Sequence, residues 1–242
     1  MSQATAIVTG APRRIGRALA LAAAGCGYDV LIHHRHAEAD AASLASEIGA
    51  LGRRAAVFAA DLADPAAPAA ILAAAQVLGP VTLLVNNASL FEEDSLATLT
   101  TTSWDEHLAV NLRAPVLLTQ AFAAALPKDR DGLVVNILDQ RVLHPGPEFF
   151  SYTLSKTSLW TATQIAARAL APRIRVNGIG PGPTLPSIHQ TAAHFAAEVA
   201  ATPLARAVDP EDIAQALRYL IGASSVTGQM IAVDAGQHLI SR

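Results

Sequence analysis

The fold is decided by the stretch "AIVTGAPRRIGRALALA", residues 6–22, in which an apolar run, a glycine loop and an alanine-rich helical segment follow one another. Gly10 permits a sharp turn after the apolar run, and Gly16 lets the helical backbone come close to that turn. The first turn of such a helix presents free N–H groups, which suit a pyrophosphate. An ordinary strand-to-helix turn can carry two glycines as well, so the loop indicates a dinucleotide site only in combination with other signals.

Short apolar runs alternate with longer helical segments along the rest of the chain. Because these runs show little alternation with polar residues, we expect both of their faces to be buried, as in a parallel sheet covered by helices. The sequence therefore predicts an α/β fold: a single domain over residues 1–242, of the Rossmann-type doubly wound kind, with a seven-stranded parallel sheet and helices on both faces. The predicted strands are 4–9, 29–33, 55–60, 82–86, 132–138, 173–179 and 229–233, and the predicted helices are 15–25, 38–51, 65–78, 103–126, 149–171 and 209–222.

Composition excludes several classes of protein. The 242 residues are 52% hydrophobic and 15% charged, which argues against disorder, and the net charge of −3 gives no sign of a nucleic-acid surface. Cys26 is the only cysteine, so no internal disulfide can form. The first ten residues lack the features of a signal peptide, and no uninterrupted run of about 20 apolar residues predicts a membrane span. We therefore expect a cytoplasmic protein with a small-molecule substrate and no nucleic-acid or membrane partner.

One segment, 181–205, breaks the alternation just before the last predicted helix. It carries prolines at 181, 183, 186 and 203, which make it an irregular excursion. Long irregular segments of this kind often cover a site, so the pattern predicts a substrate lid over about 183–205. Ordinary loop packing is the alternative.

The end of the second predicted strand indicates which nucleotide the loop prefers. NAD-preferring sites carry an Asp or Glu about 20 residues after the glycine loop. Here that place reads "HHRH", residues 33–36, and the next carboxylate is Glu38. Arg35 can pair with a 2′-phosphate, and the imidazoles of His34 and His36 can line the adenosine. The sequence therefore predicts NADPH rather than NADH, the alternative being a solvated basic turn.

Polar residues also follow the third and fourth predicted strands. Asp61 and Leu62 come after the third strand, and Asn87 and Ala88 come after the fourth. Ligands of open parallel sheets bind at the carboxyl ends of strands, so we expect Asp61 to cap the adenine amino group and the others to line the cofactor. Turn chemistry is the alternative, because Asp and Asn favour turns by themselves.

The segment "SYTLSKTSL", residues 151–159, carries the candidate catalytic pair Tyr152 and Lys156. Residues four apart share one face of a helix, and an ammonium beside a phenol stabilises the phenolate. We therefore expect Lys156 to lower the pKa of Tyr152 and make it an acid or base near neutral pH. The chain has fifteen arginines and only two lysines, so composition alone does not explain a lysine at this position. A solvated helix face is the alternative.

Two further residues are candidates for the proton path. Asp139 closes the run "LVVNILD", thirteen residues before Tyr152, and Asn111 lies midway along the helix predicted at 103–126. An asparagine in a helix is often a satisfied core residue, or it binds a water that relays protons. Both alternatives stay open for Asn111.

Together these motifs resemble the short-chain dehydrogenase/reductase family over essentially the whole chain. The family's glycine loop resembles residues 9–16, its Asn-Asn-Ala-Gly motif resembles residues 86–89, its asparagine falls on Asn111, and its Tyr-x-x-x-Lys pair falls on Tyr152 and Lys156. The resemblance implies the same fold, an oxidoreductase that uses NADP, and a homotetramer. It also implies cofactor contacts from Gly10, Arg13, Arg14, Ile15, Gly16, Leu62, Asn87, Ala88, Lys156 and the Pro-Gly pair Pro181 and Gly182.

At three positions the chain departs from the family pattern: Arg14 and Ser89 stand where glycines are common, and Asp139 stands where the family serine falls. With Phe91, these residues resemble the pteridine reductase subgroup and the related dihydromonapterin reductases. That resemblance implies that Phe91 sandwiches a pterin against the nicotinamide, and that Asp139 and Tyr152 contact the substrate. Arg14 could bridge the cofactor pyrophosphate and the polar edge of the pterin, and Ser89 could supply a hydroxyl near the ring nitrogens. Drift within a generic carbonyl reductase is the alternative.

The predicted reaction is hydride transfer from NADPH to a C=N carbon of a dihydropterin, dihydromonapterin or dihydrofolate. Asp139 and Tyr152 would form the proton relay, and Lys156 would bind the nicotinamide ribose. An imine is more basic than a ketone, so an acid at position 139 suits C=N reduction. The alternatives are an NADPH-dependent carbonyl reductase of a ketone, sugar or 3-oxoacyl substrate, and a non-catalytic NADPH-binding protein, which would be expected to have lost Tyr152 or Lys156.

Overall fold

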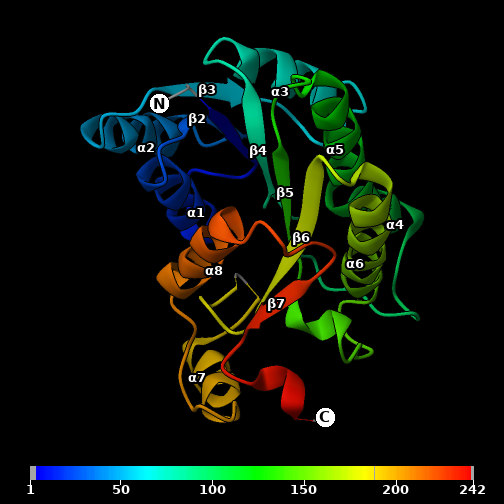
Figure 1. Ribbon diagram of the computed structural model, residues 1–242. Helices are drawn as coiled ribbons and strands as arrows, with labels where there is room; N and C mark the ends of the chain where they lie inside the picture. The colour runs from blue at the N-terminus through cyan, green and yellow to red at the C-terminus, as the bar shows by residue number, and fades with distance from the viewer. Residues whose placement is uncertain (1–3, 188, 241–242) are drawn as a thin grey trace.

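A parallel sheet of seven strands runs through the centre of the molecule in the computed structural model, which describes residues 4–187 and 189–240 (Figure 1). The strand order is β3-β2-β1-β4-β5-β6-β7, and every neighbouring pair is parallel. The sheet therefore reverses its direction of growth between β1 and β4, which is where ligands bind in doubly wound folds. The strands are β1 (Thr5–Val8), β2 (Asp29–His34), β3 (Ala55–Ala59), β4 (Val81–Asn86), β5 (Gly132–Ile137), β6 (Ile174–Pro181) and β7 (Met230–Val233).

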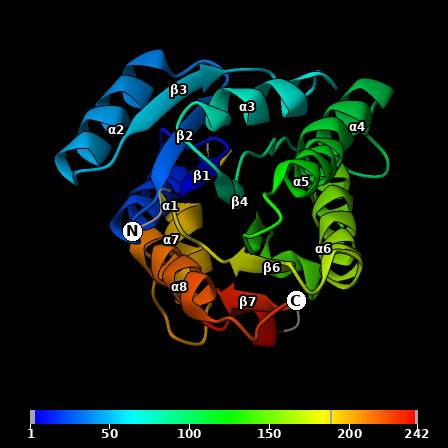
Figure 2. The same ribbon diagram turned by 45° about the horizontal axis from the view of Figure 1, so that its top comes forward.

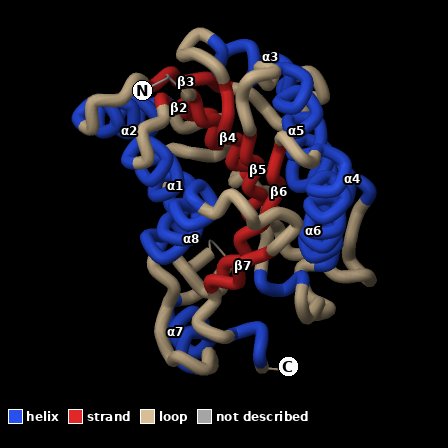
Figure 3. The backbone as a smooth tube through the Cα atoms, in the orientation of Figure 1, coloured by secondary structure: helices blue, strands red, loops and turns tan. Residues whose placement is uncertain are grey.

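Helices cover both faces of the sheet (Figure 2). One layer contains α1 (Arg14–Gly25), α2 (Glu38–Ala50) and α8 (Pro210–Gly222), and the other contains α3 (Ala67–Gln76), α4 (Thr101–Leu108), α5 (Ala114–Ala125) and α6 (Phe150–Leu170). The helix α7 (Ala192–Ala200) lies apart from the sheet, between two loop segments (Figure 3). Short 3₁₀ turns occupy Gln140–Val142 and Gln237–Leu239.

Neighbouring residues of each central strand enter different cores. In β1, Ala6 and Val8 pack with α1 and α8, whereas Ile7 packs with α3 and α5. Successive side chains of a strand point to opposite faces, so a strand that is apolar throughout needs a helical layer on each side. Both layers are present, and β1, β2, β4 and β5 are buried along their whole length.

The predicted fold class is confirmed, and the observed elements differ from the predicted ones mainly at two places. The helix predicted at 103–126 is divided by a π-helical turn, Ala109–Arg113, which contains Asn111. The excursion predicted at 181–205 is irregular only in part, because "AAHFAAEVA" forms α7 once Thr191 caps its first turn by accepting from the His194 N–H. The stretch between Pro186 and Pro203 contains no proline, so a helix can form there.

One continuous helical stretch, residues 101–125, is long and apolar enough by length and composition to cross a membrane. Core helices of globular proteins pass the same test. Here Ala114, Leu118 and Phe122 are buried against the sheet with α3, so this side of the helix belongs to the core.

Candidate active site

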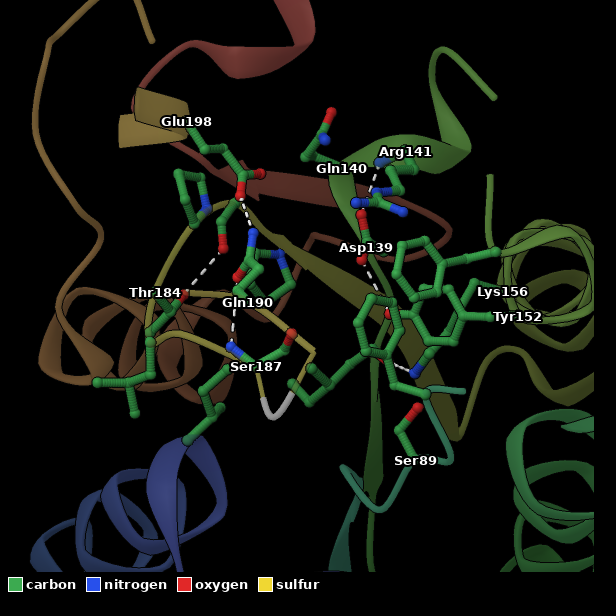
Figure 4. A pocket seen from close by; sticks show the side chains of 18 of the residues that line it. Ser89, Asp139, Gln140, Arg141, Tyr152, Lys156, Thr184, Ser187, Gln190 and Glu198 are labelled. Atoms are coloured by element: carbon green, nitrogen blue, oxygen red, sulfur yellow. Dashed lines mark hydrogen bonds between the residues drawn. The ribbon is translucent and has the colours of Figure 1, made fainter. Parts of the chain in front are cut away.

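Two adjoining cavities open at the carboxyl ends of the strands, and four residues line both of them: Arg14, Ile15, Asn87 and Ser89. The first, here called the loop cleft, has a volume of about 410 Å³ and lies along the glycine loop. It is further lined by Gly10, Arg13, Gly16, His33, Arg35, Ala60, Asp61, Leu62, Ala88, Leu90 and Val110. The second, here called the tyrosine cavity, has a volume of about 510 Å³ and contains Tyr152 (Figure 4).

Hydrogen bonds to the residues that follow β4 hold the glycine loop in place. The Asn87 side chain donates to the carbonyls of Thr9 (2.8 Å) and Gly10 (3.1 Å), and the Thr9 hydroxyl accepts from the backbone N–H groups of Asn87 and Ala88. Gly10 has a φ of +61°, and a Cβ on Gly16 would collide with the Gly10 carbonyl and lie 2.7 Å from Asn87 Nδ2. Both glycines are therefore required by backbone geometry, and the loop leaves room for a ligand beside the first turn of α1.

Three arginines line the loop cleft, and two of them, Arg13 and Arg35, face a carboxylate. Arg13 pairs with Asp40 at 2.5 Å, and Arg35 lies 3.9 Å from Asp61. All four side chains are more than a third exposed to solvent, so the arginines can exchange these partners for a ligand anion at small cost. Asp61 and Leu62, predicted to contact the cofactor, line the cleft, and one Asp61 oxygen already accepts from the backbone N–H of Ala63.

The histidine that lines the loop cleft is His33, and neither His34 nor His36 does so. His34 is buried, and its Nδ1 accepts from the Ala37 N–H, while His36 is exposed. His33 accepts from the Gly10 N–H through Nδ1 and faces the Ala60 carbonyl through Nε2, which fits the neutral ring. Burial lowers the pKa of His33 to about 4, so the ring is neutral near pH 7 and carries no charge toward a phosphate.

Tyr152 and Asp139 are directly bonded in the tyrosine cavity (Figure 4). Tyr152 Oη donates to Asp139 Oδ2 at 2.8 Å, and Asp139 Oδ1 accepts from the Arg141 N–H at 2.8 Å. Burial and the neighbouring Asp139 carboxylate raise the pKa of Tyr152 well above its usual value. The expectation that Lys156 lowers the pKa of Tyr152 is therefore wrong for this structure, because the carboxylate bonded to the phenol opposes ionisation.

Lys156 lies one helical turn after Tyr152 and is almost fully buried. Its Nζ donates to the Ile137 carbonyl at 2.7 Å and lies 5.8 Å from the centroid of the Tyr152 ring. Burial lowers the pKa of Lys156 to about 8, while Asp139 raises it in part. An ammonium has three N–H donors, so the group retains donors for ligand hydroxyls in the cavity that it lines.

Arg14 connects the glycine loop with the segment predicted to be a lid. Its guanidinium donates to the carbonyls of Leu185 (2.9 Å) and Pro186 (3.0 Å). Arg14 has a φ of +53°, a left-handed conformation that costs about 1–2 kcal/mol outside glycine. The chain thus keeps the backbone shape of a glycine loop while placing a cation between the two cavities.

Phe91 is already stacked on another aromatic ring. The Phe149 ring lies 4.2 Å away by centroid and is inclined by 13°, and the Tyr152 ring meets Phe91 edge-to-face at 4.7 Å. Phe149 also has a left-handed backbone, with a φ of +51°. Phe149 was not among the predicted site residues; the aromatic pair "FF", residues 149–150, shortly before Tyr152 was the available signal.

Asn111 lines neither cavity. Its side chain accepts from the Leu90 N–H and the Ser89 hydroxyl and donates to the Leu90 carbonyl and the Ser155 hydroxyl, which uses all four of its bonding positions. The side chain therefore fixes the loop that carries Ser89 against α6. A catalytic role for Asn111 stays a prediction.

The remaining lining of the tyrosine cavity comes from segments far apart in the sequence. Pro181 and Gly182, predicted to contact the cofactor, lie in this cavity and not in the loop cleft. The segment just before α7, α7 itself and the C-terminal 3₁₀ turn add residues that were not among the predicted site residues: Gln190, His194, Phe195, Glu198 and Gln237. No group of three or more His, Cys, Asp or Glu side chains among the described residues could hold a metal ion.

Known proteins resemble this chain over most of its length. A family model described as short chain dehydrogenase matches residues 4–196. Among solved structures, FolM alternative dihydrofolate reductase 1 from Brucella suis, in complex with NADP, is 47% identical with a TM-score of 0.95, covering 99% of this chain and 96% of that one. An uncharacterized oxidoreductase of Mycobacterium tuberculosis is 37% identical, covering 96% of this chain and 90% of that protein. The 3-oxoacyl-[acyl-carrier-protein] reductase FabG of Staphylococcus aureus is 30% identical, covering 97% and 98%.

Proposed function

The chain belongs to the short chain dehydrogenase family of oxidoreductases, and from that premise we propose that it reduces a dihydropterin with NADPH. The observation that carries the proposal is the 2.8 Å hydrogen bond from Tyr152 to Asp139, in a cavity that Arg14 and Phe91 also line. An acid pair, a cation and an aromatic ring suit a flat, amide-rich heterocycle better than a simple ketone. The 47% identity to an alternative dihydrofolate reductase supports the same choice.

The cofactor is NADP(H), and the residues of the loop cleft fit it. The glycine loop and the first turn of α1 offer backbone N–H groups to a pyrophosphate, because no Cβ fills the space at Gly10 and Gly16. Arg35 and Arg13 supply cations beside the end of β2, where a 2′-phosphate would need them. When bound, NADPH supplies the hydride of the reaction.

The proton comes from the pair formed by Tyr152 and Asp139. Burial and Asp139 raise the pKa of Tyr152, so the phenol keeps its proton near neutral pH and can serve as an acid. In the proposed reaction a ring carbon of the dihydropterin accepts the hydride, and the pair releases one proton to the adjacent ring nitrogen. Lys156 holds the ribose hydroxyls of the cofactor with the donors that it does not spend on Ile137.

Substrate binding uses the departures from the family pattern. The heterocycle packs against the aromatic pair of Phe91 and Phe149. Arg14 retains N–H donors beyond the two that bond the lid carbonyls, and these can reach the polar edge of the ring or the cofactor phosphates. A left-handed arginine is a strained choice, and such strain is typical of residues that serve a site.

The replacement Asp139→Ser, which installs the family serine, tests the proposal. We expect kcat/KM for 7,8-dihydrobiopterin to fall about 100-fold, because the acid pair is lost, while turnover of simple ketones is kept or gained. NADPH oxidation measured with a panel of pterins, ketones and 3-oxoacyl thioesters gives both values. Unchanged pterin turnover in this variant would remove Asp139 from the mechanism. A wild-type enzyme that reduces only ketones or 3-oxoacyl thioesters would favour the activity named for FabG.

We also propose that the protein is a homo-oligomer, as expected of a tetrameric family. The outer sides of α5 and α6 expose Val116, Leu154 and Ile165 by 43%, 37% and 64%. Exposed apolar side chains gathered on neighbouring helices favour association. Light scattering after gel filtration measures the mass, and a monomer of 25.1 kDa at micromolar concentration would contradict the proposal.

A further inference from the structure

Glu198 is a carboxylate of α7 that lines the tyrosine cavity on the side opposite Tyr152 and Asp139 (Figure 4). Two carboxamides converge on it: Gln190 Nε2 donates to one oxygen at 2.7 Å, and Gln237 Nε2 donates to the other at 3.0 Å. The Ser187 N–H donates to Gln190 Oε1 at 3.3 Å, which turns the amide N–H groups of Gln190 toward Glu198. The arrangement therefore holds an acceptor group at a fixed place in the cavity wall.

Neutral groups hold the Glu198 carboxylate in place. Among the described residues, no ion pair includes Glu198, and its two hydrogen-bond partners are neutral. A carboxylate has about four lone-pair positions, of which two are used here. Glu198 is only partly buried and lines the cavity, so its remaining positions can accept from a ligand.

The cavity is large enough to hold a pterin ring together with its side chain. Its volume of about 510 Å³ lies within the usual range for small-molecule sites. The reacting ring must lie at Tyr152, where the proton is, and the aromatic pair of Phe91 and Phe149 lies on the same side. A substituent of the ring then extends toward the wall formed by the lid and α7, where Glu198 lies.

We infer that Glu198 selects the substituent of the pterin: it accepts hydrogen bonds from the hydroxyl groups of a neutral side chain and repels a side chain that ends in carboxylates. This inference rests on the proposed function. It makes Glu198 a specificity-determining residue, one that changes the choice between pterins without taking part in proton transfer.

The test compares two substrates in three enzymes. The substrates are 7,8-dihydrobiopterin, whose side chain is neutral and hydroxylated, and 7,8-dihydrofolate, whose side chain ends in two carboxylates. We expect Glu198→Gln to raise kcat/KM for dihydrofolate about five- to tenfold and to lower it for dihydrobiopterin about threefold, because one charge is lost at close range in a partly solvated cavity. We expect Glu198→Asp to keep the preference of the wild type, because it keeps the charge although it is too short for both amides.

Glu211→Gln is the matched control, because it removes the same charge from the exposed pair that Glu211 makes with Arg218 on α8. It should change neither value by more than about 1.5-fold, as expected of a surface pair. A comparison of substrates in the wild type alone provides a further test. In the wild type, kcat/KM should decrease from dihydrobiopterin to 7,8-dihydropteroate, with one carboxylate, and then to dihydrofolate.

Three results would overturn the inference. Equal losses for both substrates in Glu198→Gln and Glu198→Asp would mean that Glu198 only fastens Gln190 and Gln237 to α7. A wild type that prefers dihydrofolate over dihydropteroate would mean that the cavity attracts anions. A wild type that reduces no pterin would overturn the proposed function as well, and that result is distinct from the other two.

Discussion

The loop cleft and the tyrosine cavity share four residues, yet they are built from different parts of the chain. The loop cleft is lined mainly by residues at the carboxyl ends of β1 to β4, and hydrogen bonds of Asn87 and Thr9 hold the glycine loop there. The tyrosine cavity is lined by residues that follow β4 and β5, by α6, by the segment predicted to be a lid together with α7, and by the C-terminal turn. The sheet thus fixes where a nucleotide binds, whereas side chains on separate segments decide which substrate meets it.

The largest expected effect separates chemistry from cofactor binding. Tyr152→Phe removes the proton donor and leaves the loop cleft intact, so we expect kcat to fall about 10²- to 10⁴-fold. The dissociation constant of NADPH, followed by its fluorescence, should stay within about threefold. A variant that keeps more than about a tenth of the wild-type rate would show that another group supplies the proton.

A change in the loop cleft should weaken cofactor binding. Gly16→Ala places a methyl group against the Gly10 carbonyl and Asn87 Nδ2, so the loop must shift. We expect NADPH to bind at least about tenfold more weakly and the free energy of unfolding to fall by about 1–3 kcal/mol, as for overpacked cores. Fluorescence titration and thermal unfolding measure the two effects.

Gly25→Ala provides the matched control for that loop variant. Gly25 ends α1 and has nothing within 4 Å of an added Cβ. Alanine there should leave NADPH binding unchanged and raise the free energy of unfolding by up to about 1 kcal/mol. Equal losses of binding in both glycine variants would mean that the loop geometry is not what holds the cofactor.

The buried Lys156 makes the stability of the protein depend on pH. Burial lowers the pKa of Lys156 to about 8, whereas an unfolded chain keeps it near 10.4. Between these values the unfolded state binds a proton that the folded state has released, so the free energy of unfolding rises with pH. The burial penalty is present in full below about pH 8 and is relieved above about pH 10.4, by roughly 3 kcal/mol in total.

Lys156→Met isolates this effect, because it removes the ionisable group and keeps an apolar side chain of similar length. We expect the stability of the wild type relative to Lys156→Met to increase between pH 8 and pH 10, measured by urea unfolding at each pH. A constant difference over that range would mean that the folded protein leaves the pKa of Lys156 near its ordinary value.

The sequence predicted the loop cleft better than the tyrosine cavity, for a physical reason. Strand ends in a parallel sheet meet at one edge, so apolar runs followed by Gly10, Asp61 or Asn87 were enough to assemble the cleft. That pattern could not decide whether His33 or His34 lines the cleft. Neighbouring strand residues point to opposite faces, and the two histidines differ by one position.

The tyrosine cavity depends on contacts that no local pattern encodes. Glu198 reaches it because α7 forms within a segment predicted to be irregular, and Gln237 reaches it from a turn near the C-terminus. The π-helical turn at 109–113 also escaped prediction, because its apolar and polar residues fit an ordinary helix equally well. Such features follow from tertiary packing and not from propensity.

The smallest expected effect concerns which arginine of the loop cleft recognises the 2′-phosphate of NADPH. Arg35 follows β2 directly and faces Asp61 only at 3.9 Å, whereas Arg13 is held by Asp40 at 2.5 Å. Arg35 is therefore the freer cation, and Arg35→Ala should lower kcat/KM for NADPH about tenfold, which corresponds to one charge-assisted hydrogen bond, and leave that for NADH within about twofold. Arg13→Ala is the matched comparison, with an expected loss below about threefold. If Arg13→Ala instead caused the larger loss of preference for NADPH over NADH, the 2′-phosphate site would lie at the first turn of α1. The selectivity would then belong to the glycine loop and not to the end of β2.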